Sequence, residues 1–127
     1  MAKRLLECVP NFSEGRDYAK IAAISDAAKG IEGAMVLGIE PDADYNRTVL
    51  TIAGEPEAVF LAAKRVIAAA AEHIDMRNHS GEHPRIGAVD VCPFVPLEGV
   101  SMDDCVQLAQ RLAKEVSEEL DLCTFLY

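Results

Sequence analysis

The order of strand-like and helix-like hydrophobic patterns constrains the fold of this chain more than any other feature. Apolar residues with strand-like patterns occur at residues 5–9, 34–39, 47–53 and 89–97. The third of these segments alternates, and it places Thr48, Leu50 and Ile52 on one side of the expected strand. Two stretches with the 3.6-residue spacing of amphipathic helices separate the strands. The resulting order is strand, helix, strand, strand, helix, strand.

Three helices are predicted. The first covers residues 18–29, with Ile21, Ile24 and Ala28 on one face and Gly30 as its C-terminal cap. The second opens at residues 54–57, where Pro56 suits a first helical turn. Its apolar stripe comprises Val59, Ala63, Val66, Ile67, Ala70 and Ile74. The third begins at the capping-box-like run SMDD, residues 101–104. Its apolar face comprises Cys105, Leu108, Ala109, Leu112 and Val116.

The remaining segments complete the predicted architecture. Residues 34–39 are continuously apolar and are expected to form a central strand, whereas Pro93 and Pro96 should bend residues 89–97 or place them partly at an edge. Residues 11–17, 40–46 and 75–88 are expected to be irregular, and residues 124–127 to form a last strand. The prediction is one α/β (α+β) domain over residues 1–127. It has a ferredoxin-like βαββαβ core with an added αβ, and its helices pack on one face of a mainly antiparallel sheet.

Charge and composition narrow the possible partners. Twelve basic and 21 acidic residues give a net charge of −9, so a nucleic-acid partner is not expected. Neither a signal peptide nor a membrane-length apolar stretch is readable, which favours a cytoplasmic protein without a membrane partner. The four cysteines show no C-x-x-C spacing, and we expect buried free thiols.

A polar run, GEHPRIG at residues 81–87, is the main candidate for chemistry. Glycine and proline favour a loop, and His83 on such a loop can exchange a proton near neutral pH. With His79 the run also reads H-x-x-E-H, a zinc-peptidase pattern. That pattern needs both histidines on one helix face, which the flanking glycine and Pro84 disfavour. We therefore expect no metal site.

Two further segments offer binding groups. Asn11 opens a loop that leads into the first helix, where backbone N–H groups can hold an anionic ligand. The alternative is a capping loop in which Ser13 or Asp17 satisfies the start of the helix, and the two roles are compatible. Residues 40–46 carry Glu40 and two aspartates, followed by Arg47. Arg47 and Arg85 either clamp a carboxylate or neutralise the neighbouring acids.

Four runs together resemble a known family. They are ECVPNFSEG (residues 7–15), NRTV (46–49), the GEHPRIG run and GAVDVCPF (87–94). They are similar to the N-terminal subdomain of glutamate formimidoyltransferases, and the resemblance extends from about residue 5 to the last residue. It implies the same architecture as the hydrophobic pattern.

The resemblance also implies an activity and residue roles. The family transfers a formimino group from N-formiminoglutamate to N5 of tetrahydrofolate, with tetrahydrofolate as co-substrate and no metal. His83 matches the family's catalytic acid–base histidine, and the resemblance favours Asn11 as a substrate-binding residue. Many members have aspartate where Glu40 stands, and we expect Glu40 to bind substrate together with Arg47 and Arg85.

The family also sets expectations about assembly. Its members bind folate between two similar subdomains, and this chain matches only the first. We therefore expect a homo-oligomer or a complex with a second formiminotransferase half, and an exposed apolar patch where that half docks. Two alternatives stay open: a glutamate formyltransferase, and a non-catalytic half that binds folate or serves assembly.

Overall fold

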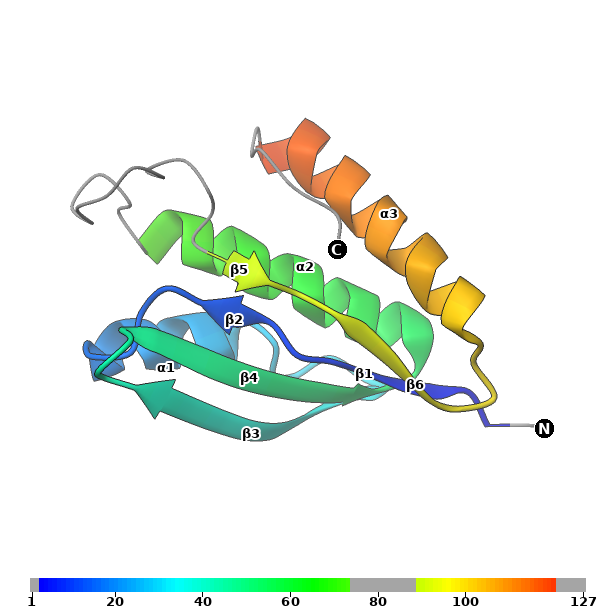
Figure 1. The fold of residues 1–127 in the computed structure, drawn as a ribbon, viewed down its shortest axis with the longest axis horizontal. Helices are drawn as coiled ribbons and strands as arrows, with labels where there is room; N and C mark the ends of the chain where they lie inside the picture. The colour runs from blue at the N-terminus through cyan, green and yellow to red at the C-terminus, as the bar shows by residue number, and fades with distance from the viewer. Residues whose placement is uncertain (1–2, 74–88, 121–127) are drawn as a thin grey trace.

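The computed structural model describes residues 3–73 and 89–120 of the chain (Figure 1). Its elements in chain order are β1 (Leu5–Cys8), β2 (Asn11–Phe12), α1 (Tyr18–Asp26), β3 (Ala34–Asp42), β4 (Arg47–Gly54), α2 (Pro56–His73), β5 (Val89–Val91), β6 (Phe94–Glu98) and α3 (Met102–Leu120). His83, Arg85, the expected irregular segment 75–88 and the expected last strand 124–127 lie outside the described residues.

Within the described residues the strands form one sheet in which every pairing is antiparallel. β1 and β2 both pair with β4, so they act as one strand interrupted around Pro10. β5 and β6 likewise act as one interrupted strand, since β5 pairs with β2 and β6 with β1. The spatial order is therefore β3, β4, β1–β2, β5–β6, which is the order expected for a split βαβ unit. The predicted fold class is confirmed.

The helices cover one face of this sheet, and the hydrophobic core lies between the two layers (Figure 1). α2 contacts both α1 and α3, and α3 also packs on β6. Alternate sheet residues enter the core because successive side chains point to opposite faces of a strand. The sheet's fully or nearly fully buried side chains are Leu6, Cys8, Phe12, Thr48, Leu50, Ile52 and Phe94. The opposite side of the sheet, which we call the open face, has no helix over it among the described residues.

The helical predictions are confirmed on the described residues, except that the first helix is shorter than predicted. Ile21, Ile24 and Ala28 are buried, as are Val59, Ala63, Val66, Ile67 and Ala70 of α2. α1 ends at Asp26, not at residue 29, and Ala27 is its C-cap. Gly30 instead serves the following turn with a φ of 78°. The N-cap is Asp17, whose carboxylate accepts the N–H groups of Ala19 and Lys20 at 3.0 and 3.2 Å.

The strand predictions need three corrections. Asn11 and Phe12 form β2 instead of belonging to a loop, because pairing with β4 resumes directly after Pro10. β3 extends to Asp42, so Glu40 lies in a strand and not in a loop. β3 is also an edge strand and not a central one, since among the described residues it pairs only with β4. The prediction for residues 89–97 is confirmed, because the segment is interrupted at Cys92 and Pro93 between β5 and β6 and lies at the other edge.

Candidate functional site

A row of residues crosses the sheet and joins two of the predicted site residues. Val49 on β4 pairs with Glu40 on β3 and with Asn11 on β2. Residues directly opposite each other in neighbouring strands share a face. Adjacent strands are about 4.8 Å apart, so Glu40 and Asn11 lie on one face with backbones about 10 Å from each other. This face is the open face, because Thr48 and Leu50, the residues on either side of Val49 in β4, point into the core.

The next pair on the same face brings in a guanidinium group. Arg47 on β4 pairs with Asp42 on β3, two residues along each strand from Val49 and Glu40. The Arg47 guanidinium carbon lies 5.7 Å from the centre of the Tyr45 ring. The strand pairing therefore brings Asn11, Glu40 and Arg47 to one face of the sheet.

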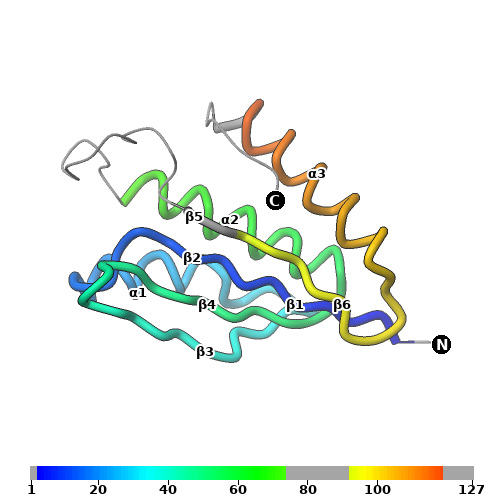
Figure 2. Tube along the Cα trace, viewed as in Figure 1, coloured from blue at the N-terminus to red at the C-terminus, as the bar shows by residue number. Residues whose placement is uncertain are grey.

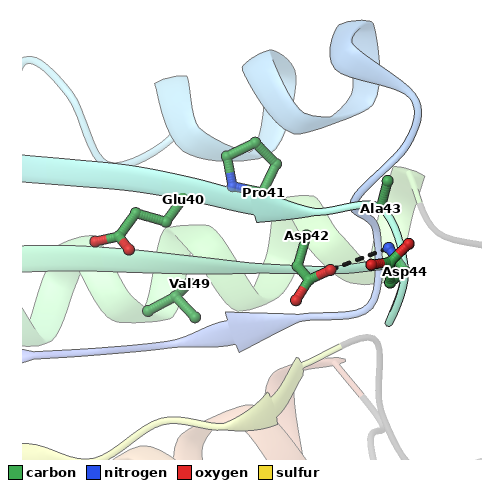
Figure 3. A pocket seen from close by; sticks show the side chains of 6 residues that line it. All are labelled: Glu40, Pro41, Asp42, Ala43, Asp44 and Val49. Carbon is green, nitrogen blue, oxygen red and sulfur yellow. Dashed lines mark hydrogen bonds between the residues drawn. The ribbon is translucent and has the colours of Figure 1, made fainter.

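The β3–β4 turn forms a shallow hollow of about 360 Å³ beside these residues. Its lining residues are Glu40, Pro41, Asp42, Ala43, Asp44 and Val49. Figure 3 shows the Glu40 and Asp42 carboxylates on the same side as Val49, whereas the ring of Pro41 points toward α1. One oxygen of Asp42 accepts the N–H groups of Asp44 and Tyr45 at 3.0 and 3.3 Å, which fixes the turn. The three carboxylates make the hollow a negatively charged site suited to a cationic group.

A second set of contacts holds the β3–β4 turn against residues 13–17, at the same end of the sheet (Figure 2). The Gly15 N–H donates to Oδ1 of Asn46 at 2.9 Å, and Nε of Arg16 donates to the Ala43 carbonyl at 2.8 Å. The hydroxyl of Thr48, which is fully buried, donates to the carbonyl of Glu14. We call this set the loop–turn contact, and it fixes Asp42 and Arg47 relative to the segment that follows Asn11.

Sequence reasoning did not name Arg16 or Asn46 as site residues. Asn46 has a φ of 51°, a left-handed conformation that asparagine tolerates better than most residues. An asparagine directly before a strand is the signal that would have found it. Arg16 carried no such signal, because its partner is a backbone carbonyl 27 residues away.

Asn11 offers one more polar atom to a ligand. Its side-chain oxygen Oδ1 is buried and accepts no hydrogen bond within the described residues. A buried acceptor without a donor is costly, and native proteins leave few such atoms. This makes the Asn11 amide a candidate for binding a donor group of a substrate.

Two of the predicted site residues, His83 and Arg85, lie outside the described residues. In the part of the chain that is described, no three histidine, cysteine or acidic side chains gather as a metal site would require. None of the described helices combines the length and apolar character needed to cross a membrane.

Comparison with known proteins gives the family. Residues 5–127 match the family described as formiminotransferase domain, N-terminal subdomain. The chain belongs to this family. It is 49% identical over 123 residues to the glutamate formimidoyltransferase of Thermoplasma acidophilum, a match that covers 97% of this chain and 41% of that protein. Against the Streptococcus pyogenes serotype M1 glutamate formimidoyltransferase, identity is 43% over 127 residues, 100% of this chain and 42% of that protein.

A longer relative also matches nearly the whole of this chain over a small part of its own length. The formimidoyltransferase-cyclodeaminase of Rattus norvegicus is 48% identical over 124 residues, which cover 98% of this chain and 23% of that protein. The chain therefore spans less than half the length of these relatives. The family membership confirms the resemblance that the four sequence runs indicated.

Proposed function

We propose that this chain is the N-terminal subdomain of a glutamate formimidoyltransferase. The whole enzyme would transfer the formimino group of N-formimino-L-glutamate to N5 of tetrahydrofolate, its co-substrate, as part of one-carbon metabolism and histidine breakdown. The observation that carries the proposal is the open-face grouping of Glu40, Asn11 and Arg47 in a chain of this family. We further propose that the enzyme is cytoplasmic and uses no metal.

The charges of the grouping suit the formimino donor. Its amidine is protonated near neutral pH, and the exposed carboxylate of Glu40, which lines the acidic hollow, can hold that cation. The donor's glutamate part carries carboxylates, which a guanidinium binds in bidentate fashion. Arg47 lies one pair farther along the same face and would take this role, with Arg85 as a second candidate. The Asn11 amide oxygen would accept an N–H group of a substrate.

Proton transfer is assigned to His83. His83 lies six residues before Val89, the first residue of β5, and Val89 pairs with Phe12 directly beside Asn11. Six residues span at most about 20 Å, so chain length permits His83 to reach the Asn11–Glu40 row. This connectivity supports the role of His83 that the family resemblance implies.

The reaction then follows from these groups. N5 of tetrahydrofolate attacks the carbon of the amidinium, and a tetrahedral adduct forms. His83 accepts the proton that N5 loses and returns a proton to the glutamate nitrogen. The bond from carbon to that nitrogen breaks, glutamate leaves as its amine, and the formimino group stays on N5. Acid–base catalysis of this kind contributes about 10²–10⁴-fold to the rate, and positioning of the two substrates supplies much of the rest.

The open face also carries apolar side chains that a second part of the enzyme would cover. Met35, Ala53, Glu7 and Val95 form one row across four strands on this face. Met35 is 65% exposed, and Leu97, two residues along β6 from Val95, is 53% exposed. Exposed apolar side chains gathered on one face mark an interaction surface. We propose that the remaining part of the longer enzyme, or a second formiminotransferase half in a homo-oligomer, docks here and completes the folate site.

The first test compares the chain alone with the assembled enzyme. With both substrates, we expect feeble or no turnover from the isolated chain and full turnover when the second half is present. In the assembled enzyme, His83→Ala should lower kcat by about two orders of magnitude. His73→Ala, which alters an exposed histidine at the end of α2, is the matched control and should leave kcat unchanged. Near-normal turnover by His83→Ala would refute the assignment.

A second test separates the proposed donor from its formyl analogue. Glu40→Gln removes the negative charge but keeps the length of the side chain. It should raise the KM for the cationic N-formiminoglutamate by about tenfold or more, since hydrogen bonds to charged groups contribute about 1.5–3 kcal/mol. Glu98→Gln, an exposed change at the far edge of the sheet, is the control.

The alternatives predict different results. Preferred turnover of neutral N-formylglutamate, insensitive to Glu40→Gln, would identify a formyltransferase instead. Folate binding without turnover of either donor by the assembled protein would identify a non-catalytic half.

A further inference from the structure

Two cysteine side chains that the proposed reaction does not use meet across the sheet. Sγ of Cys8, the last residue of β1, lies 3.3 Å from Sγ of Cys92, which joins β5 to β6. The two residues are 84 positions apart in the sequence, and both are free thiols. Cys8 is fully buried, whereas Cys92 is only partly buried.

The backbone around the pair is fixed by hydrogen bonds. Cys8 is in register with Phe94, and the N–H of Val9 donates to the carbonyl of Pro93 at 3.1 Å. The two sulfur atoms therefore face each other from strands that are already paired. A disulfide has an S–S distance of about 2.04 Å, so closure needs an approach of roughly 1.3 Å. Small rotations about the side-chain torsions supply such a movement without breaking the strand pairing.

We propose that Cys8 and Cys92 are a redox modification site that a peroxide converts to a reversible intramolecular disulfide. In the first step the Cys92 thiolate attacks a peroxide oxygen, the O–O bond breaks, and Cys92 becomes a sulfenic acid as hydrogen peroxide is reduced to water. In the second step Cys8 attacks the sulfenic sulfur, the S–O bond breaks, and hydroxide leaves with the Cys8 proton as water. Two thiols and one peroxide thus give one disulfide and two waters.

The unequal burial of the two thiols assigns their roles. Cys92 has exposed surface, so it is the thiol that an oxidant can reach first. Burial raises the pKa of the Cys8 thiol most, and the hydrogen bond with Cys92 raises it further. Cys8 therefore stays protonated in the reduced chain. Cys8 is therefore the resolving thiol. A dithiol reductant restores both thiols by thiol–disulfide exchange.

Cys105 provides an internal control for this chemistry. It is buried on α3, and burial raises its pKa as well. Among the described residues, the Cys105 thiol makes no sulfur–sulfur hydrogen bond, in contrast to the contact between Cys8 and Cys92. A buried thiol that is not in contact with a second thiol should stay reduced under conditions that oxidise the Cys8–Cys92 pair.

The test is a peptide map of the wild-type chain and three variants. The reduced protein is treated with hydrogen peroxide, free thiols are blocked with N-ethylmaleimide, and the digest is analysed without reductant. In the wild type and in Cys105→Ala, we expect a peptide joining Cys8 to Cys92, with a loss of two hydrogen atoms that dithiothreitol reverses. In Cys8→Ala, this product should disappear and a sulfenic-acid reagent such as dimedone should label Cys92. Cys92→Ser should lose both signals.

Each other outcome counts against the proposal. A wild-type map in which Cys92 proceeds to sulfinic acid, or pairs with another cysteine, would overturn it. The proposal also fails if N-ethylmaleimide still labels both thiols after treatment with an excess of peroxide. The decisive map uses the unaltered chain, so the result does not depend on whether a variant folds.

Discussion

Replacing Gly15 by alanine tests how closely the loop–turn contact is packed. A Cβ atom at Gly15 would lie 2.3 Å from the carbonyl oxygen of Asp42, and 2.5 and 2.7 Å from the backbone N and O of Arg47. A comfortable carbon–oxygen contact is about 3.3 Å. Since all three neighbours are backbone atoms, no side chain can rotate away, and the β3–β4 turn must move by roughly 1 Å.

The cost of that movement has three parts. Overpacking of this kind costs about 1–3 kcal/mol. The shift would also stretch the 2.9 Å hydrogen bond from Gly15 to Asn46, which contributes about 0.5–1.5 kcal/mol. Alanine restricts the unfolded chain more than glycine does, which offsets about 0.4–1 kcal/mol. We expect Gly15→Ala to lower the free energy of unfolding by about 2 kcal/mol.

Gly38→Ala is the matched control. Gly38 lies in β3, and a Cβ there would meet only a carboxylate oxygen of Glu40 at 4.0 Å. Neither Gly15 nor Gly38 has the positive φ that would strain an alanine. Both variants share the effect on the unfolded chain, so the difference between their urea midpoints measures the steric clash together with the stretched Gly15–Asn46 hydrogen bond. Equal midpoints for the two variants would refute the close approach at Gly15.

Three further predictions concern other local contacts. Ser101→Ala removes the hydroxyl that accepts the Asp104 N–H at 3.0 Å at the start of α3, and should cost about 1 kcal/mol in urea unfolding. The hydrogen bond from the backbone N–H of Ser101 lowers the pKa of Asp104 most, and the Ser101 side chain lowers it further. The Asp104 carboxylate therefore binds a proton more readily in the unfolded chain than in the folded chain. The stability that the ionised Asp104 contributes is lost as the pH falls through its pKa in the folded chain. Asp104→Asn should flatten the loss of stability below about pH 4. Thr48→Val leaves the Glu14 carbonyl without its buried donor and should cost about 1–3 kcal/mol, against about 0.5 kcal/mol or less for Thr51→Val on the open face.

Each of these has an outcome that contradicts it. The capping argument fails if Ser101→Ala unfolds at the wild-type urea concentration. An unchanged pH profile in Asp104→Asn would mean that other carboxylates dominate the acid loss of stability. Equal costs for Thr48→Val and Thr51→Val would show that the buried hydroxyl is replaceable without penalty.

The sequence by itself determined the fold class and most of the core. The alternation at residues 47–53 gave the buried face of β4, and the 3.6-residue spacing gave the buried stripe of α2. Both patterns are local, since side-chain direction repeats every two residues in a strand and every 3.6 in a helix. Local chemistry likewise predicted the cap at Ser101 and offered Asp17, with Ser13 as the alternative, for the first helix. The family followed from short runs of residues for the same reason, because each run is contiguous.

Only the tertiary structure decided which strand lies where and which side chains meet. The apolar run in β3 was expected at the centre of the sheet, yet β3 is an edge strand whose side chains reach the open face. An apolar run alone cannot separate a central strand from an edge strand, because both faces of an edge strand can carry apolar side chains. Glu40 was expected in a loop, but pairing with Val49 keeps it in the strand.

The contacts between distant segments were likewise invisible in the sequence. Asn11 and Glu40 share a row because both pair with Val49, and Cys8 meets Cys92 because β1 and β6 pair in one register. A shift of one residue in either pairing would turn these side chains to the opposite face. Register is set by the packing of the whole core, so no local pattern could have specified these contacts.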